Sequence, residues 1–322
     1  SSDLWAGLVG GAIAVLPLPW RLRLLALPLL LPLIDPPLRL PEPGRFELLA
    51  ADIGQGSALL LRTRNHALLF DAGPAYWRGG DAGERVLLPL LRAQGVRRLD
   101  MMVLSHADTD HIGGAASLLA ALPTAALLGS LPATHALRSA GVPFQPCLRG
   151  QHWQWDGVRF EVLHPFSEAQ AASTKLKSNA RSCVLRVADA AGDALLLTGD
   201  IEAAQEAQLV AAERERAGVS RTGAAGERAA PLRSSILVAP HHGSRSSSSA
   251  AFIDAVAPSW VVVQAGYGNR FGHPAATVVE RYALRAVDLR RSDACGAFGW
   301  RDGAPRCQRD EARRYWQHMP PR

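Results

Sequence analysis

The sequence LSHADTDHIGG at residues 104–114 places two imidazoles and two carboxylates within six positions. The apolar run 99–104 leads into it and predicts a strand, and the small residues of 115–122 predict a helix after it. A single His or Asp beside a strand is usually a cap or a surface hydrogen-bonding group, but four of them closed by Gly-Gly are hard to explain that way. Imidazole nitrogens and carboxylate oxygens are ligands of divalent metals. The stretch therefore predicts a metal-binding turn between a strand and a helix.

Three other polar residues each follow an apolar, strand-like run: Asp71, Asp200 and His241. If these strands share a sheet edge with the 104–114 turn, their polar ends converge. One turn cannot supply the ligands of two ions, so this convergence is what a two-metal site requires. His242 is an alternative ligand to His241, because neighbouring imidazoles are expected to point apart.

The composition is compatible with a folded core but does not identify a binding partner. The chain has 322 residues, is 48% hydrophobic and 20% charged, and carries a net charge of +6 with a pI near 9.6. Nearly all of its basic residues are arginine, so the charge reflects either attraction to a polyanion or an Arg-rich composition. No Cys-x-x-Cys pair is present, which argues against a structural zinc knuckle. Two states of the four cysteines are compatible with the sequence. Either Cys295 and Cys307 form a disulfide, which requires an oxidising compartment, or all four cysteines are free thiols.

The N-terminal part differs in composition from the rest. Residues 4–20 and 24–34 are almost wholly apolar, are separated by Arg21 and Arg23, and are interrupted by prolines. Neither run reaches the ~20 residues of a membrane span. We expect residues 1–40 to form a short membrane-associated segment with a Pro-rich linker, and residues 41–322 to form the globular domain. A buried core helix is the alternative for the apolar runs.

Several motifs together resemble a known family. The pattern His-x-Asp-x-Asp-His-x-Gly-Gly, followed by TGD at 198–200 and HHGS at 241–244, resembles the metallo-β-lactamase superfamily. DIGQG at 52–56, FDAG at 70–73 and GHP at 272–274 narrow the resemblance to the C-terminal domain of ComEC-type competence proteins, which are DNA-uptake channels. The similarity runs from about residue 45 to the C-terminus. It implies an α/β fold, a four-layer αβ/βα sandwich with the site at one end of the two sheets.

The resemblance also implies a function and a set of site residues. It implies a divalent-metal nuclease that degrades one DNA strand while the other enters the cell. The implied metal ligands are His106, Asp108, Asp110, His111, Asp200 as the bridge, and His241 or His242. Asp71 is expected to orient the turn from behind, and Asp110, Asp71 and His273 to take part in catalysis. His273 would protonate the leaving group or hold a phosphate oxygen.

Two departures from the commoner superfamily pattern affect the metal. Asp108 stands where that pattern has His, and the added carboxylate favours Mn²⁺ or Mg²⁺, with Zn²⁺ possible. The pattern also has a His between the turn and the bridging Asp, for which this chain offers only His152 and His164. We expect His164 to be structural, and Asn179 to be a weak oxygen ligand in its place.

The expected partners are DNA, single- or double-stranded, and the membrane channel portion of the same polypeptide, with no nucleotide cofactor. Five cations on loops would contact the DNA backbone. Three lie in the polar stretch 167–181, namely Lys175, Lys177 and Arg181, and the other two are Arg245 and Arg270. The domain is expected at the inner membrane, on its periplasmic face. Two alternatives use the same fold: a hydrolase of a small thioester or phosphodiester, and a non-catalytic DNA-binding module.

Overall fold

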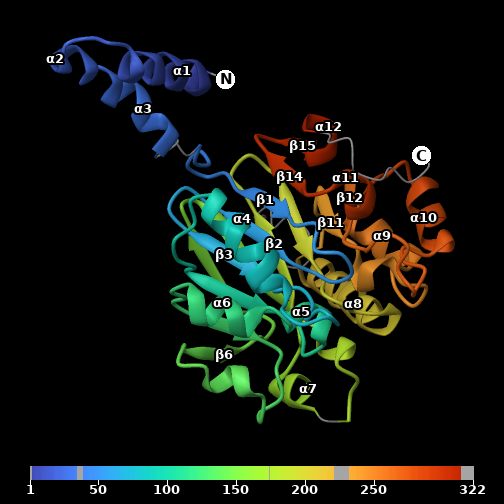
Figure 1. Cartoon of the computed structure of the whole chain (residues 1–322). Helices are drawn as coiled ribbons and strands as arrows, with labels where there is room; N and C mark the ends of the chain where they lie inside the picture. The colour runs from blue at the N-terminus through green and yellow to red at the C-terminus, as the bar shows by residue number, and fades with distance from the viewer. Residues whose placement is uncertain (1, 35–38, 174, 221–231, 313–322) are drawn as a thin grey trace. The chain divides into compact units, whose positions relative to one another are not determined.

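The computed structural model of the protein describes residues 2–34, 39–173, 175–220 and 232–312. Apolar strands followed by polar residues recur along these ranges. The chain divides into two units, Ser1–Leu40 and Pro41–Arg322. Part of the expected Pro-rich linker, residues 35–38, lies outside the described residues. The larger unit contains two β-sheets (Figure 1).

The first sheet has the strand order β15-β14-β1-β2-β3-β4-β5-β6. Its strands in chain order are β1 (Glu47–Ala50), β2 (Leu59–Arg62), β3 (Ala67–Phe70), β4 (Met101–Leu104), β5 (Leu127–Gly129), β6 (Phe144–Pro146), β14 (Phe298–Arg301) and β15 (Ala304–Cys307). The run from β3 to β6 is parallel, and the remaining pairs are antiparallel. β3 and β4 therefore end at the same edge, where the 104–114 turn begins.

The second sheet has the order β13-β12-β11-β10-β9-β8-β7. Its strands are β7 (His152–Trp155), β8 (Val158–His164), β9 (Val184–Ala188), β10 (Ala194–Leu197), β11 (Ile236–Val238), β12 (Trp260–Val263) and β13 (Asp288–Arg291). The run from β10 to β13 is parallel, so the segments that follow β10 and β11 also leave from one edge. Parallel strands buried on both faces read as continuous apolar runs, as β10 and β11 do.

Helices cover the outer face of each sheet (Figure 1). Beside the first sheet lie the π-helical turn η1 (Gly83–Leu87), α4 (Leu88–Ala93), α5 (Thr109–Ile112), α6 (Ala115–Ala121) and the 3₁₀ turn η2 (Ala136–Ser139). The second half contributes α7 (Glu168–Ala172), η3 (Asn179–Arg181), α8 (Ala203–Ser220), η4 (Pro240–Gly243), α9 (Ala250–Val256), α10 (Ala276–Ala283), α11 (Ser292–Cys295) and α12 (Gln308–Glu311).

The core has three layers of buried side chains, and these define the four-layer sandwich. One cluster fills the space between the sheets, with Val103 and Phe160 among its members. A second packs the outer face of the first sheet on α4 and α6. A third packs the outer face of the second sheet on α8, α9 and α10, around the buried Tyr282. The expected αβ/βα fold is confirmed.

The N-terminal unit consists of α1 (Ser2–Val15), α2 (Trp20–Arg23) and α3 (Ala26–Ile34). α1 and α3 pack together at Gly10, where an added Cβ would lie 2.9 Å from the Cβ of Leu29. None of the helices in the described ranges combines the length and the apolar character that a membrane-crossing segment needs.

Candidate metal centre

The 104–114 turn folds as expected, between β4 and the short helices α5 and α6. Its closing glycines are required by close packing. A Cβ on Gly113 would lie 2.0 Å from the backbone N of Ala75, and one on Gly114 would lie 2.3 Å from that of Gly83. The segment after β3 therefore packs directly against the end of α5, the helix that carries Asp110 and His111.

Asp110, His111 and His242 form the first donor group. Nε2 of His242 lies 3.3 Å from Oδ2 of Asp110 and 3.2 Å from Nε2 of His111. Oδ1 of Asp200 lies 3.0 Å from Nε2 of His111 and 3.6 Å from Nε2 of His242. Donor atoms from three segments, α5, the end of β10 and η4, thus meet at one point.

His106, Asp108 and His241 form the second donor group, around the other oxygen of Asp200. Nε2 of His106 lies 3.5 Å from Oδ2 of Asp108 and 4.0 Å from Oδ2 of Asp200. Nε2 of His241 lies 3.7 Å from the same Asp200 oxygen. The Asp200 carboxylate therefore lies between the two groups and faces each with one oxygen.

These donor groups fit divalent cations. Ligand atoms bonded to one ion at about 2.1 Å lie roughly 3–3.5 Å apart, close to the separations within the first group. Nε2 of His106 and Oδ1 of Asp200 are buried without a hydrogen-bond partner among the described residues. Buried polar atoms rarely lack a partner unless an ion or water satisfies them. The residues present therefore suit the two metal ions that the sequence predicts.

Both imidazoles of the His241-His242 pair face the centre, so the expectation that they point apart is wrong. His241 has φ 49° and His242 has φ 53°, both in the left-handed region. Two successive left-handed residues remove the alternation of side chains that an extended chain would give. His241 then faces the second donor group and His242 the first.

Asp71 and Ser105 hold two of the imidazoles from behind. Oδ1 of Asp71 accepts a hydrogen bond from the Ser105 backbone N–H at 2.7 Å, and Oδ2 accepts one from the Ser105 hydroxyl at 2.9 Å. Nδ1 of His111 lies 2.7 Å from Oδ2 of Asp71, and Nδ1 of His106 lies 3.0 Å from the Ser105 hydroxyl oxygen. Such contacts fix the ring orientation and leave Nε2 directed at a metal.

The carboxylates are ionised because of their surroundings. Burial raises the pKa of Asp200, but the charges of His111 and His242 outweigh it and hold the pKa well below its ordinary value. Burial likewise opposes ionisation of Asp110, and the contact with His242 lowers its pKa nonetheless. The contact with His106 lowers the pKa of Asp108. Three negative charges are therefore available to a cation at neutral pH.

Gln264, at the end of β12, joins the two halves of the fold beneath His242. Its backbone oxygen lies 2.8 Å from Nδ1 of His242. Its side-chain Oε1 accepts hydrogen bonds from the Ser57 hydroxyl and the Ala58 N–H, and its Nε2 donates to the Ala51 oxygen. Sequence reasoning missed this residue. The signal was present, because Gln264 is one more polar residue that ends an apolar run.

The DIGQG motif packs against the same region. Gly56 has φ 137°, and a Cβ there would lie 2.3 Å from the backbone oxygen of Asp110. Gln55 accepts a hydrogen bond at Oε1 from the Gly266 N–H, at 3.3 Å. The glycine at position 56 is therefore required for the close approach of this turn to α5.

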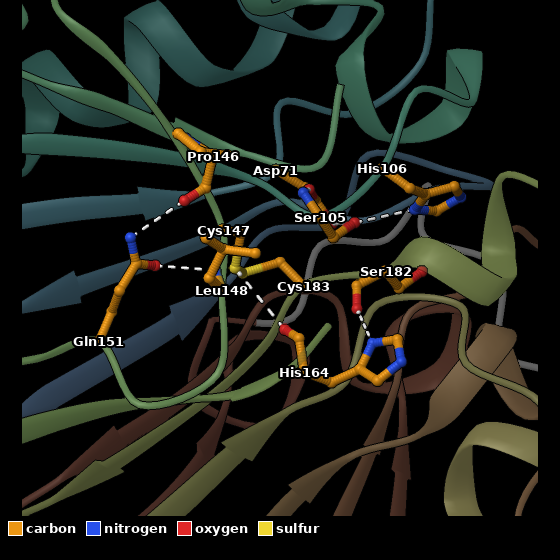
Figure 2. The surroundings of a disulfide bond; sticks show 10 residues. All are labelled: Asp71, Ser105, His106, Pro146, Cys147, Leu148, Gln151, His164, Ser182 and Cys183. Atoms are coloured by element: carbon orange, nitrogen blue, oxygen red, sulfur yellow. Dashed lines mark hydrogen bonds between the residues drawn. A yellow bond between two sulfur atoms is a disulfide. The ribbon is translucent and has the colours of Figure 1, made fainter. Parts of the chain in front are cut away.

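A disulfide between Cys147 and Cys183 joins the two sheets directly behind the site (Figure 2). Cys147 follows β6, and Cys183 precedes β9. The Cys183 N–H donates to the Ser105 oxygen at 2.7 Å, and the adjacent Ser182 hydroxyl accepts from the Asp200 N–H at 3.1 Å. A second disulfide joins Cys295 and Cys307, so the open question about that pair is answered in favour of a bridge.

The remaining histidines take different places. His273 lies beside the centre, with its ring 5.7 Å from that of His241 and 6.4 Å from that of His242. Burial and the neighbouring His242 lower the pKa of His273 to about 4. His164 is buried away from the donors, between the Ser182 oxygen and the Gln170 amide, as expected for a structural residue.

Asn179 and His152 are the other residues considered as replacements for a missing ligand. The Asn179 amide nitrogen lies 3.4 Å from Nε2 of His241, at the edge of the second donor group. His152 lies on the exposed face of β7, with Nδ1 2.9 Å from the Gly150 oxygen, and belongs to neither donor group.

Four of the five predicted DNA-contacting cations are exposed: Lys175, Lys177, Arg245 and Arg270. Ser178, beside Lys177, accepts a hydrogen bond from the Ala107 N–H, which places their loop against the metal-binding turn. Arg181 differs, because η3 turns it inward and only 7% of it is exposed. A residue buried to this degree cannot track a DNA backbone from the surface, so that expectation for Arg181 is corrected.

Comparison with known proteins agrees with this geometry. The family profile described as "Metallo-beta-lactamase superfamily" matches residues 51–263. "Competence protein ComA" of Neisseria gonorrhoeae is 39% identical over 84% of this chain and 34% of its own length. "Recombination protein 2" of Haemophilus influenzae is 32% identical over 71% of this chain and 25% of its own length. The chain thus spans a quarter to a third of these relatives.

A solved structure shows the same fold at low identity. The diiron β-hydroxylase CmlA of Streptomyces venezuelae superimposes with a TM-score of 0.50 and 14% identity, over 82% of this chain and 55% of that one. With the donor groups and the family match, the fold implies divalent metal ions. The chain belongs to the metallo-beta-lactamase superfamily and is related within it to the ComEC-type competence proteins.

Proposed function

We propose that this chain is a divalent-metal-dependent deoxyribonuclease that hydrolyses DNA phosphodiester bonds, degrading the strand that is not taken up during natural competence. The observation that carries the proposal is the Asp200 carboxylate, which faces one donor group with each oxygen. Two ions bound there would lower the pKa of a water molecule and neutralise charge on the phosphate. The kinship with competence proteins supports DNA as the substrate.

The protein residues have distinct parts in this proposal. Asp71 and Ser105 keep Nε2 of His111 and His106 directed at the donor groups. Asp110 contributes negative charge beside His242. His273 is neutral near neutral pH because its pKa is about 4, so holding a phosphate oxygen suits it better than giving a proton. The exposed cations Lys175, Lys177, Arg245 and Arg270 would contact neighbouring phosphates.

The donor set favours Mn²⁺. Three carboxylates, from Asp108, Asp110 and Asp200, supply hard oxygen ligands beside the imidazoles. Carboxylate oxygens suit Mn²⁺ or Mg²⁺, and Asp108 supplies one where the commoner pattern of the superfamily has an imidazole, a ligand that suits Zn²⁺. We expect Mn²⁺ to support the highest activity and Zn²⁺ a lower one.

We further propose a place at the inner membrane, on its periplasmic face, next to a channel portion of the same polypeptide. Two disulfides support an oxidising compartment. Exposed apolar side chains on α1–α3, such as Trp5, Val15 and Trp20, support contact of that segment with lipid.

The test is degradation of end-labelled linear DNA over time. With added Mn²⁺ we expect wild type to degrade the DNA, and Asp200→Asn to lose at least about 100-fold in rate, because the shared carboxylate is lost. Asp254→Asn is the matched control, because Asp254 is an exposed carboxylate on α9 that forms an ion pair with Arg285. Comparison of Mn²⁺ with Zn²⁺ in the same assay tests the metal preference.

The alternatives predict other results. A hydrolase of small esters would cleave a chromogenic phosphodiester and leave DNA intact. A non-catalytic DNA-binding module would bind DNA and retain no metal in millimolar Mn²⁺. Either result would reject the nuclease proposal.

A further inference from the structure

Exposed aromatic side chains lie on loops that adjoin the metal centre. In the described part of Pro41–Arg322, the exposed large hydrophobic side chains are Trp77, Leu176, Tyr267, Phe271 and Leu284. All three aromatic residues among them lie on two loops, 73–82 and 264–275. Large apolar side chains exposed together on one loop, as Tyr267 and Phe271 are, generally mark a binding surface.

The first loop, 73–82, follows β3 and adjoins the first donor group. Its Ala75 backbone N would lie 2.0 Å from a Cβ on Gly113, directly after the helix that carries Asp110. Trp77, two residues further along, is 98% exposed. An indole so fully exposed contributes nothing to the core and offers its ring to another molecule.

The second loop holds a row of rings that runs from the surface to the metal centre. The rings of Phe271 and His273 are stacked, with centroids 5.6 Å apart and planes at 24°. The rings of His273 and His242 are also stacked, 6.4 Å apart and again at 24°. His242 belongs to the first donor group, whereas Phe271 is 54% exposed. The outer end of this row, Phe271 with the Arg270 guanidinium over its ring, is therefore accessible from the surface.

Positive charge accompanies these rings. The Arg270 guanidinium lies 4.8 Å from the centre of the Phe271 ring. Tyr267, on the same loop, is 62% exposed, and Arg245 is exposed on the segment that follows His242. Alternating aromatic rings and cations match alternating bases and phosphates.

We propose that Phe271, together with Tyr267 and Trp77, forms a base-stacking platform that binds single-stranded nucleic acid beside the metal centre, with Arg270 contacting phosphate. The inference rests on the proposed nuclease function and adds the form of its substrate. Bases in a duplex are stacked on one another and do not expose their faces, whereas bases of a single strand do. Strand selectivity then arises from the platform rather than from the metal ligands.

The test measures binding without cleavage, by fluorescence anisotropy in the presence of EDTA. The probes are a short oligothymidylate, an abasic strand with the same number of phosphates, and a duplex of equal length. We expect wild type to bind the oligothymidylate about 10-fold or more tightly than the abasic strand, because each stacked base adds affinity. Phe271→Ala should abolish that difference, and Phe271→Trp should retain it.

Two control variants separate stacking from other effects. Leu284→Ala removes an even more exposed apolar side chain at the C-terminal end of α10 and should leave all three affinities unchanged. Arg270→Ala should weaken binding of the oligothymidylate and the abasic strand alike and reduce the salt dependence.

The inference is overturned if wild type binds the abasic strand as tightly as the oligothymidylate, or if Phe271→Ala weakens both equally. It is also overturned if Phe271→Ala changes only the sedimentation of the protein, which would make the patch a contact between copies of the chain. Failure of the nuclease proposal looks different: DNA would remain uncut in Mn²⁺ while the base-dependent binding persisted.

Discussion

Oδ2 of Asp71 lies 2.7 Å from Nδ1 of His111, although 40 positions separate the two residues. The contact connects the end of β3 to α5 across the edge of the first sheet. Asp71 is fully buried, and its other oxygen is occupied by the Ser105 N–H. The carboxylate therefore sets the direction of His111, whose Nε2 faces Asp200. Asp71 is a positioning residue, because its oxygens face the imidazole and the turn rather than the donor groups.

Replacing Asp71 by Asn should weaken metal binding about 10- to 100-fold, as loss of a carboxylate behind a ligating imidazole usually does. The amide keeps the shape of the side chain but places a nitrogen against either Ser105 or His111. Isothermal titration with Mn²⁺ measures the affinity, and denaturant unfolding measures the accompanying loss of stability.

Asp100→Asn is the matched control for that variant. Asp100 immediately precedes β4 and accepts a hydrogen bond from the Ala67 N–H at the opposite end of the same strands. Its substitution should leave Mn²⁺ affinity unchanged. Equal Mn²⁺ affinities for wild type and Asp71→Asn would show that Asp71 does not position His111.

Gln264→Ala should destabilise the fold more than it weakens metal binding. The substitution leaves the buried Ala58 N–H and Ala51 oxygen without the partners that the side chain supplies, at a cost of about 3 kcal/mol. The backbone oxygen that faces His242 is retained. Urea unfolding and Mn²⁺ titration of the same preparation separate the two effects. Gln154→Ala, on the exposed face of β7, should change neither. A stable variant that binds no metal would contradict this account.

The two disulfides should differ in what their removal does. The Cys147–Cys183 bridge spans 36 positions and should stabilise by about 4 kcal/mol, and the Cys295–Cys307 bridge, which spans 12, by about 3 kcal/mol. Only the first lies beside Ser105 and Ser182, so only its double alanine variant should also lose Mn²⁺ affinity. Unfolding and metal titration of both double variants test this. Loss of affinity in the Cys295→Ala, Cys307→Ala protein would contradict it.

The layers of the fold could be predicted because apolar runs and polar ends are local properties of the sequence. Strands buried on both faces, such as β4 and β10, are read directly from their composition. The strand β13 and the pairing of the hairpin β14–β15 with β1 could not be predicted this way, because Asp288–Arg291 is mostly charged and no local pattern reports a pairing with a distant strand. Their pairing depends on the edges offered by β1 and β12, which are distant in sequence.

The site could be predicted as a set of residues but not as an arrangement. The donors His106 to His111 stand together in the sequence, and Asp200 follows a strand. His241 and His242 both direct their imidazoles at the centre because both have a left-handed backbone conformation, which cannot be read from the composition. The burial of Arg181 depends on the short turn η3, and the role of Gln264 on contacts across both sheets. These features depend on contacts between segments that are distant in sequence, so no local sequence pattern predicts them.

His164 should make stability depend on pH. Burial lowers the pKa of His164 from 6.5 to about 4, outweighing the hydrogen bond with the Ser182 oxygen. Because the folded pKa lies below the unfolded one, the unfolded chain binds more protons between these values, and stability falls as pH decreases through that window. The shift from 6.5 to about 4 corresponds to about 3 kcal/mol, fully present above pH 6.5 and lost by about pH 4.

His164→Asn should remove this component of the pH dependence, because an amide does not titrate and its nitrogen can still donate to the Ser182 oxygen. Urea unfolding of wild type and variant across the window measures the difference between their slopes. His152→Asn, on the exposed face of β7, is the control and should keep the wild-type slope. Parallel curves for wild type and His164→Asn would mean that His164 takes up its proton equally readily in the folded chain.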